Sequence, residues 1–271
     1  MLRKYPGVTM IRLLIGCLLL TCLNLAHAKG LSCTRNFTLA LHEHGLLYSV
    51  NSNTGIDKDF ADELIRRSGC KITLSVLPRT RIWQLIESGA LDFSLSGISN
   101  AERQRFASFA WYFSNKYYLL VRKDANIRKL NDFEKNDQLL LGVIRGFRYS
   151  DTGNRLVDKL HELDRVSQAG GLAPLYQTLI LNRIQGMIIE PFDYPMLEEK
   201  QIHACSTIIE FNDPPVAHGL IMSNKALTTA EQAGFRELVN GMRADGTIRR
   251  IFEKYFPPEL AGSMLDIPAT R

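Results

Sequence analysis

Long hydrophobic runs are scarce in this sequence. After residue 28, no segment has the roughly 18 consecutive apolar residues that a membrane-spanning helix needs. Charge of one sign is also scarce, because the formal net charge is +5 and three of the basic residues lie within the first 28. The remaining charge of +2 gives no electrostatic case for binding nucleic acid. The sequence also has no G-x-S-x-G pattern and no evident nucleophile and base pair, so it carries no hydrolase signature.

The first 28 residues have the features of an export signal. Basic residues precede an apolar run over 13–25, which ends in Ala26-His27-Ala28. A basic segment, an apolar segment and an A-x-A site in this order predict a signal peptide over 1–28, cleaved after Ala28. Met1 and Met10 are both candidate starts. The pattern predicts a soluble mature chain in the periplasm.

Cysteine is rare, and three cysteines remain after the signal: Cys33, Cys70 and Cys205. Cys33 and Cys70 each stand just before a predicted strand. If the two strands are parallel neighbours, both cysteines lie at the same sheet edge and can form a disulfide in an oxidising compartment. Three unpaired thiols are the alternative. Cys205 has no evident partner.

Three apolar strands alternate with two helices in the first part of the chain, and this order predicts a mainly parallel α/β sheet. We expect strands over 37–41, 72–76 and 91–95, and helices over 57–68 and 82–88. A second α/β series follows, with strands over 139–144, 187–189 and 206–211 and helices over 151–163, 172–182 and 191–200. Two more helices are expected over 229–243 and 247–255.

Extended segments near 117–122 and 214–222 flank the second series. Two such crossings predict that the chain leaves one lobe, builds a second and returns. A cleft between two lobes is a natural place for a small ligand. Residues 257–271 are predicted to be a loose tail.

Several stretches resemble the family 3 extracellular solute-binding proteins, known as amino-acid-binding subunits of ABC importers. The stretches that carry the resemblance are "GIDKDFADELIRRSG", "RIWQLIESGALDFSLSGISNAERQRFASFAWYF", "YYLLVRKD", "LLLGVIRGFRYSD", "LILNRIQGMIIEPF" and "NGMRADGTIRRIFEKYF". Their order and spacing are together specific. The chain departs from the family at Gly146-Phe147, where the family has Gly-Thr, and it lacks the family's first-strand Pro-Pro-Phe.

The resemblance implies a two-lobed periplasmic binding protein fold of type II, with two hinge crossings. It places lobe 1 at 29–118 and 220–256 and lobe 2 at 119–219. It implies a monomeric, non-enzymatic protein that captures an amino acid or related carboxylate, needs no cofactor, and delivers the ligand to an inner-membrane ABC permease or to a sensor. A ligand-sensing module without transport and a cyclohexadienyl dehydratase-like enzyme are the alternatives.

Arg103 and Glu190 are the principal predicted ligand contacts. We expect Arg103 to begin a helix after Ser99 or Asn100, and the resemblance implies that its guanidinium pairs with the ligand's carboxylate. A solvated surface arginine is the alternative. Glu190 follows a predicted strand at its carboxyl end, where ligands of α/β sheets bind. The resemblance implies that it receives the ligand's ammonium, and a carboxylate serving a helix start is the alternative.

Further candidates surround these two residues. Arg148, after Gly146 and Phe147, is expected to add an anionic contact. The remaining predicted contacts are Ser96, Gly97, Ile98 and Ser99 as backbone or hydroxyl contacts, Tyr48 and Trp111 as aromatic walls, and Arg81, with Arg79 beside it, as an anion contact at the cleft mouth. His42 and His44 share one face of a strand end, but a third ligand with clear spacing is missing, so no metal site is predicted.

Overall fold

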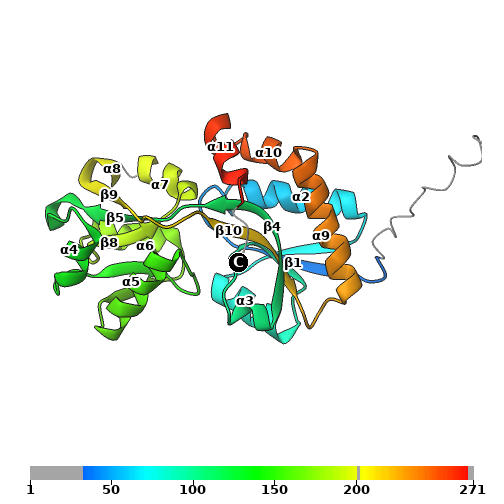
Figure 1. Ribbon diagram of the computed structural model, residues 1–271, viewed down its shortest axis with the longest axis horizontal. Helices are drawn as coiled ribbons and strands as arrows, with labels where there is room; N and C mark the ends of the chain where they lie inside the picture. The colour runs from blue at the N-terminus through cyan, green and yellow to red at the C-terminus, as the bar shows by residue number, and fades with distance from the viewer. Residues whose placement is uncertain (1–32, 200–201, 268–271) are drawn as a thin grey trace, which may run out of the picture. The chain divides into compact units, whose positions relative to one another are not determined.

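The computed structural model describes residues 33–199 and 202–267. The predicted signal peptide, its cleavage site at Ala28 and the alternative start at Met10 lie outside this part of the chain. Within it, no helix has both the length and the apolar character required to cross a membrane. The described chain forms two lobes, each built on one five-stranded sheet with helices packed against it (Figure 1).

The sheet of the first lobe has the order β2-β1-β3-β10-β4. Its strands are β1 (Phe37–Leu41), β2 (Ile72–Val76), β3 (Phe93–Gly97), β4 (Ala107–Asn115) and β10 (Val216–Ser223). β1 pairs in parallel with β2 and β3, as the alternation of strands and helices predicts, whereas β10 runs antiparallel to β3 and β4. The sheet is therefore mixed, because its last two strands come from chain segments that cross between the lobes.

Five helices belong to this lobe: α2 (Ile56–Ser68), α3 (Arg79–Ser88), α9 (Thr229–Ala244), α10 (Thr247–Phe252) and α11 (Pro258–Leu265). In Figure 1, α2 and α10 lie above the sheet, α9 runs down its right-hand side, and α3 lies below it. α2 ends at Gly69, whose left-handed backbone favours glycine. α11 corrects the prediction of a loose tail over 257–271 for residues 258–265, because its buried Ala261 and Met264 hold the helix against the lobe. Residues 268–271 lie outside the described part of the chain.

The sheet of the second lobe has the order β7-β6-β8-β5-β9. Its strands are β5 (Tyr118–Arg122), β6 (Leu141–Ile144), β7 (Val166–Ala169), β8 (Gly186–Ile189) and β9 (Ser206–Glu210). β6 pairs in parallel with β7 and β8, and β5 runs antiparallel to β8 and β9. The chain enters this sheet after β4 and returns to the first at β10, so the two predicted crossings are present.

The helices of the second lobe are α4 (Leu130–Lys135), α5 (Asp151–Glu162), α6 (Leu172–Ile180), α7 (Tyr194–Glu199) and α8 (Ile202–Cys205). Apolar side chains fill both sides of the sheet. One cluster includes Leu141, Leu156 and Ile188, and the other includes Ile144, Leu175 and Met187. Successive residues of a strand face opposite sides of the sheet, and each side is covered by one of these clusters. These short strands are therefore buried at every position and have no polar residue.

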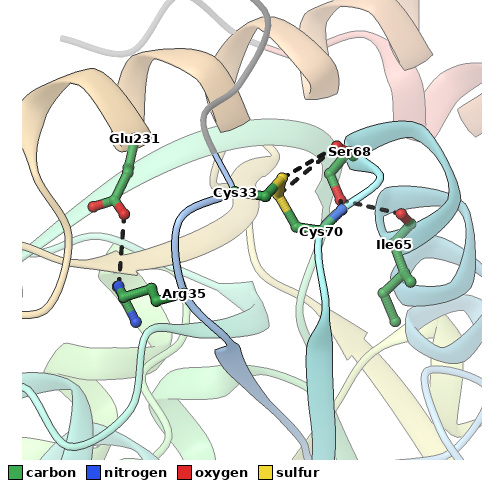
Figure 2. The surroundings of a disulfide bond; sticks show 6 residues. All are labelled: Cys33, Arg35, Ile65, Ser68, Cys70 and Glu231. Carbon is green, nitrogen blue, oxygen red and sulfur yellow. Dashed lines mark hydrogen bonds and ion pairs between the residues drawn. A yellow bond between two sulfur atoms is a disulfide. The ribbon is translucent and has the colours of Figure 1, made fainter.

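A disulfide joins Cys33 and Cys70, as the parallel pairing of β1 and β2 allows. Their Cα atoms are 5.1 Å apart, and the bond closes a loop across 37 positions of sequence. Figure 2 shows the bond beside Ser68, at the end of α2. Cys205 is exposed and not in a disulfide.

Candidate functional site

A small inner cavity lies where loops of the two lobes meet. Its lining comes from the first lobe (Leu47, Arg79, Trp83, Ser96, Gly97, Ile98, Arg103 and His218) and from the crossing and the second lobe (Tyr117, Gly146, Phe147, Arg148 and Glu190). The cavity volume is about 20 Å³, which is room for about one water molecule. A solute can enter only if the walls of this inner cavity move apart.

A larger outer cavity of about 420 Å³ adjoins the inner one. The two cavities share Trp83, Arg103 and the loop 146–148, and the outer one extends between α3 and α5. Arg103 and Trp83 therefore stand between the inner cavity and the outer one. The two cavities are thus separated by a wall that these residues share.

Arg103 is 7% exposed and connects the two lobes. Its Nη1 donates to the Ile98 carbonyl at 3.0 Å, and its Nη2 donates to the Gly146 carbonyl, in the second lobe, at 2.9 Å. The guanidinium carbon lies 3.9 Å from the Trp83 ring centroid, a cation–π distance. Burial, followed by repulsion from Arg79 and Arg148, lowers the pKa of Arg103 to about 9.

The prediction that a helix begins at Arg103 is wrong. The segment makes a single 3-10 turn, Arg103–Arg105, and leads directly into β4. Asn100 does accept the Arg103 N–H through its side chain at 2.8 Å. The turn ends early because β4 is rich in aromatic residues, which favour a strand.

Glu190 follows β8, as predicted, and is 5% exposed. His44 Nε2 lies 2.6 Å from Oε1 of Glu190, and Asn115 Nδ2 donates to Oε2. Burial alone would raise the pKa of Glu190, but the hydrogen bond from His44 and the charges nearby lower it. Both carboxylate oxygens are therefore already bonded within the protein.

Asp193 completes a buried group with His44 and Glu190. Its Oδ1 lies 3.4 Å from His44 Nε2, and one ligand atom from each of the three residues lies within 4.8 Å of the others. Burial, together with the nearby charge of Glu190, raises the pKa of Asp193 to about 7. Two carboxylates and an imidazole could hold a divalent cation. The sequence does not predict this site, because no local spacing marks Asp193 as a third ligand beside His44 and Glu190.

Arg79 is 5% exposed and lines the inner cavity, whereas Arg81 is exposed and does not. Arg79 Nη1 donates to the Leu95 carbonyl at 3.0 Å, and its guanidinium lies 5.6 Å from the Phe147 ring. The sequence predicts that this helix begins at Ile82, but α3 begins at Arg79. Residues three and four apart share a helix face, so Arg79 lies with the buried Ile82 and Trp83.

Ser96, at the end of β3, anchors a second buried network. Its backbone has φ of 52°, a left-handed conformation that costs energy for a residue other than glycine. Ser96 Oγ donates to Asp57 Oδ1 at 2.6 Å, and His218 Nδ1 lies 3.3 Å from the Ser96 carbonyl. Tyr117 Oη lies 3.2 Å from His218 Nε2. Burial lowers the pKa of His218 to about 4, so this imidazole is neutral at pH 7.

Most of the residues predicted from the sequence line the inner cavity: Ser96, Gly97, Ile98, Arg103, Gly146, Phe147, Arg148 and Glu190. Four predicted contacts are not in its lining. Tyr48 Oη donates to Asn53, Trp111 stacks on Phe109, and Ser99 has a buried hydroxyl without a hydrogen-bond partner in the described chain. Arg81 bonds only to Gln84, at 3.5 Å, among the contacts described for it.

Besides Asp193, several residues of the site are absent from the sequence prediction, among them Tyr117, His218 and Asn115. Tyr117 and His218 stand in the extended crossings, and Asn115 ends β4. A polar residue within an otherwise apolar crossing, such as His218 in "VAHGLIMS", is the signal that could have identified it. Asn115 carries no local signal, because its partner Glu190 is 75 positions away.

Comparison with known proteins is consistent with this geometry. Residues 46–258 match the family model of the bacterial extracellular solute-binding proteins, family 3. A search of curated protein sequences found no match.

Solved structures of similar fold are numerous. The arginine-, lysine-, histidine-binding protein ArtJ from Geobacillus stearothermophilus is 16% identical, with a TM-score of 0.70 over 82% of this chain and 95% of its own. The GluR0 ligand-binding core from Nostoc punctiforme, bound to L-glutamate, is 14% identical, with a TM-score of 0.67 over 81% and 99%. A histidine kinase sensor domain is 12% identical, with a TM-score of 0.69 over 82% and 96%.

Proposed function

The chain belongs to the family 3 bacterial extracellular solute-binding proteins, and from this membership we propose that it captures a small polar solute, an amino acid or related carboxylate, between its two lobes. The observation that carries the proposal is the placement of Arg103. Its guanidinium is buried, bonds to carbonyls of both lobes and stands between the two cavities. A guanidinium in this position can exchange carbonyl bonds for stronger, paired bonds to a carboxylate.

Closure of the lobes is the proposed mechanism. The sequence-based bounds, 29–118 and 220–256 for lobe 1 and 119–219 for lobe 2, shift slightly at each crossing, because β5 (Tyr118–Arg122) belongs to the second sheet and β10 (Val216–Ser223) to the first. The two crossings act as the hinge. A solute that contacts Arg103 and the 146–148 loop stabilises the closed form over the open form. The free energy by which the solute shifts the equilibrium between the open and closed forms is limited by the difference between its binding free energies for the two forms.

We assign the chain to the periplasm as a monomer that delivers its solute to an ABC permease of the inner membrane. Solute sensing is the second candidate, and the similarity to a histidine kinase sensor domain favours it. Uptake of labelled solute by cells with and without this protein separates the two roles. Import requires that uptake fall when the protein is absent, whereas sensing leaves uptake unchanged.

A dehydratase-like enzyme is not proposed. A carboxylate acting as general acid near neutral pH needs a raised pKa. Hydrogen bonding from His44 holds the pKa of Glu190 below its ordinary value despite burial. Glu190, the carboxylate that lines the inner cavity, therefore does not have the raised pKa that this chemistry requires, and Asp193, whose pKa burial raises to about 7, does not line that cavity.

Calorimetry tests the proposed site. A thermal-shift screen of amino acids and small carboxylates selects a solute, and titration calorimetry then compares wild type with Arg103→Ala and Arg105→Ala. Arg105 is the matched control, because it lies in the same turn but is exposed. We expect Arg103→Ala to weaken binding by about tenfold or more, since charge-assisted hydrogen bonds contribute about 1.5–3 kcal/mol. Equal affinity of Arg103→Ala and wild type would contradict the assignment.

A further inference from the structure

Two buried guanidiniums in the inner cavity lack a carboxylate partner. Arg79 and Arg103 are 5% and 7% exposed, and neither makes an ion pair within the described residues. Arg103 uses two N–H groups on carbonyls and Arg79 uses one, of the five that a guanidinium carries. Buried cations are ordinarily paired, so the positive charge in this part of the cavity is only partly compensated by the carboxylates nearby.

The two charges also act on each other. Burial and then the charge of Arg79 lower the pKa of Arg103, and burial lowers the pKa of Arg79. Asp57 partly offsets Arg79, but its carboxylate accepts bonds from Ser96 and Tyr112 and does not line the cavity. Only a solute entering the cavity can bring a negative group into direct contact with both guanidiniums.

Glu190 is the only carboxylate in the described lining of the inner cavity, and it is occupied. Its Oε1 lies within hydrogen-bond distance of His44, and its Oε2 accepts from Asn115. Asp193, the next carboxylate, accepts the Glu190 N–H through Oδ2 and faces His44 through Oδ1. A solute ammonium could use only the remaining lone pairs of Glu190 and would lie in a cavity that also holds two cations.

From these observations we infer that the solute is a small dianion without an ammonium group, such as a dicarboxylate. This inference rests on the proposed function. It narrows the solute class from amino acids and related carboxylates to anions that carry no ammonium group. Arg103 binds one anionic group and Arg79 the other. Arg148, at the rim, is 40% exposed and pairs with Asp158 at 3.3 Å, so it contributes less.

Matched pairs of solutes test the inference with the wild-type protein. Succinate and L-aspartate differ by one ammonium group, as do glutarate and L-glutamate. In titration calorimetry at pH 7.5, we expect at least one ammonium-free acid to bind tenfold or more tightly than its amino acid. Inorganic phosphate is a third arm, because a guanidinium also binds phosphate. Tighter binding of phosphate than of either dicarboxylate would support a solute with two negative charges and would identify it as a phosphate-like anion and not a dicarboxylate.

Arg79→Gln gives a second readout, with Arg81→Gln as the control. Arg81 lies on the same helix but is exposed. We expect Arg79→Gln to weaken the dianion by tenfold or more while Arg81→Gln changes affinity less than twofold. Circular dichroism verifies that both variants fold. The comparison of matched solutes uses the wild-type protein, so it does not depend on the folding of either variant.

The outcomes separate this inference from the proposed function. If the amino acid of each pair binds more tightly, the inference is wrong. If the bound solute is neutral or cationic, the inference is also wrong, but the proposed function stands where Arg103→Ala weakens that solute. If no solute in the screen or the pairs binds, both are contradicted.

Discussion

Asp193 is a buried acid whose ionisation should make stability depend on pH. Burial, followed by the charge of Glu190, raises the pKa of Asp193 to about 7 in the folded chain, while the unfolded chain keeps a value near 3.8. A raised folded pKa contributes stability below the unfolded value, and this contribution is lost as the pH rises through the folded value. The pH window for the loss therefore runs from about 4 to about 7.

Asp193→Asn should remove this loss. We expect the difference in the free energy of unfolding, variant minus wild type, to increase by on the order of 1–2 kcal/mol between about pH 5 and pH 7. Urea unfolding at several pH values measures the difference, and Asp137→Asn, at an exposed position, is the control. A difference that does not change with pH would contradict the buried ionisation of Asp193.

At the residue scale, the sequence predicts where a site residue stands in the fold better than it predicts which residue it bonds to. Arg103 and Glu190 were located because each follows a recognisable strand and turn. Glu190 bonds to His44 across 146 positions of sequence, and no local pattern encodes such a contact. Arg81 was preferred to Arg79 as an anion contact because a shift in the start of α3 changes which arginine faces inward.

The disulfide ties β1 to β2, and its removal should lower stability. On the chain-entropy model, a loop across 37 positions contributes about 3–4 kcal/mol to the free energy of unfolding. We expect Cys33→Ser, and wild type in dithiothreitol, to lose about this amount in urea unfolding. Cys205→Ser should unfold like wild type, since Cys205 is exposed and not in a disulfide. A loss below about 1 kcal/mol for Cys33→Ser would contradict the prediction.

α11 should contribute to stability through Met264. Met264 is 4% exposed, and Ser114 Oγ in β4 lies 3.5 Å from its carbonyl. Truncating a buried methionine costs about 2–5 kcal/mol, so Met264→Ala should lower the thermal midpoint by several degrees. Leu260, on the same helix, is 38% exposed, and Leu260→Ala should change it little. Equal effects of the two substitutions would show that α11 does not pack as described.

At the element scale, apolar alternation and glycine caps predicted most elements of the fold. β7 was missed because Val166–Ala169 has no buried position and so no alternating pattern. β4 (Ala107–Asn115) is not among the strands predicted from the sequence, although its residues carry part of the family resemblance. α11 was missed because only Ala261 and Met264 of its residues are buried, which gives a weak helical signal.

For the whole molecule, the two crossings and the order of elements predicted two lobes. The pairing of β10 between β3 and β4 was not predicted, because it joins segments more than 100 positions apart. Arg103 belongs to the first lobe and donates to the Gly146 carbonyl of the second, so an anion that contacts both Arg103 and the 146–148 loop should hold the two lobes together. Closure by an anionic solute is therefore the central claim.

A distance measured across the outer cavity tests this claim most directly. Glu87 on α3 and His161 on α5 are exposed and line that cavity from opposite lobes. In a Cys205→Ser background, nitroxide labels at Glu87→Cys and His161→Cys report the distance by pulsed dipolar spectroscopy. We predict that the solute bound most tightly in calorimetry shifts a broad distribution to a shorter, narrower one, and that adding Arg103→Ala abolishes the shift. A saturated protein with an unchanged distribution would contradict the account.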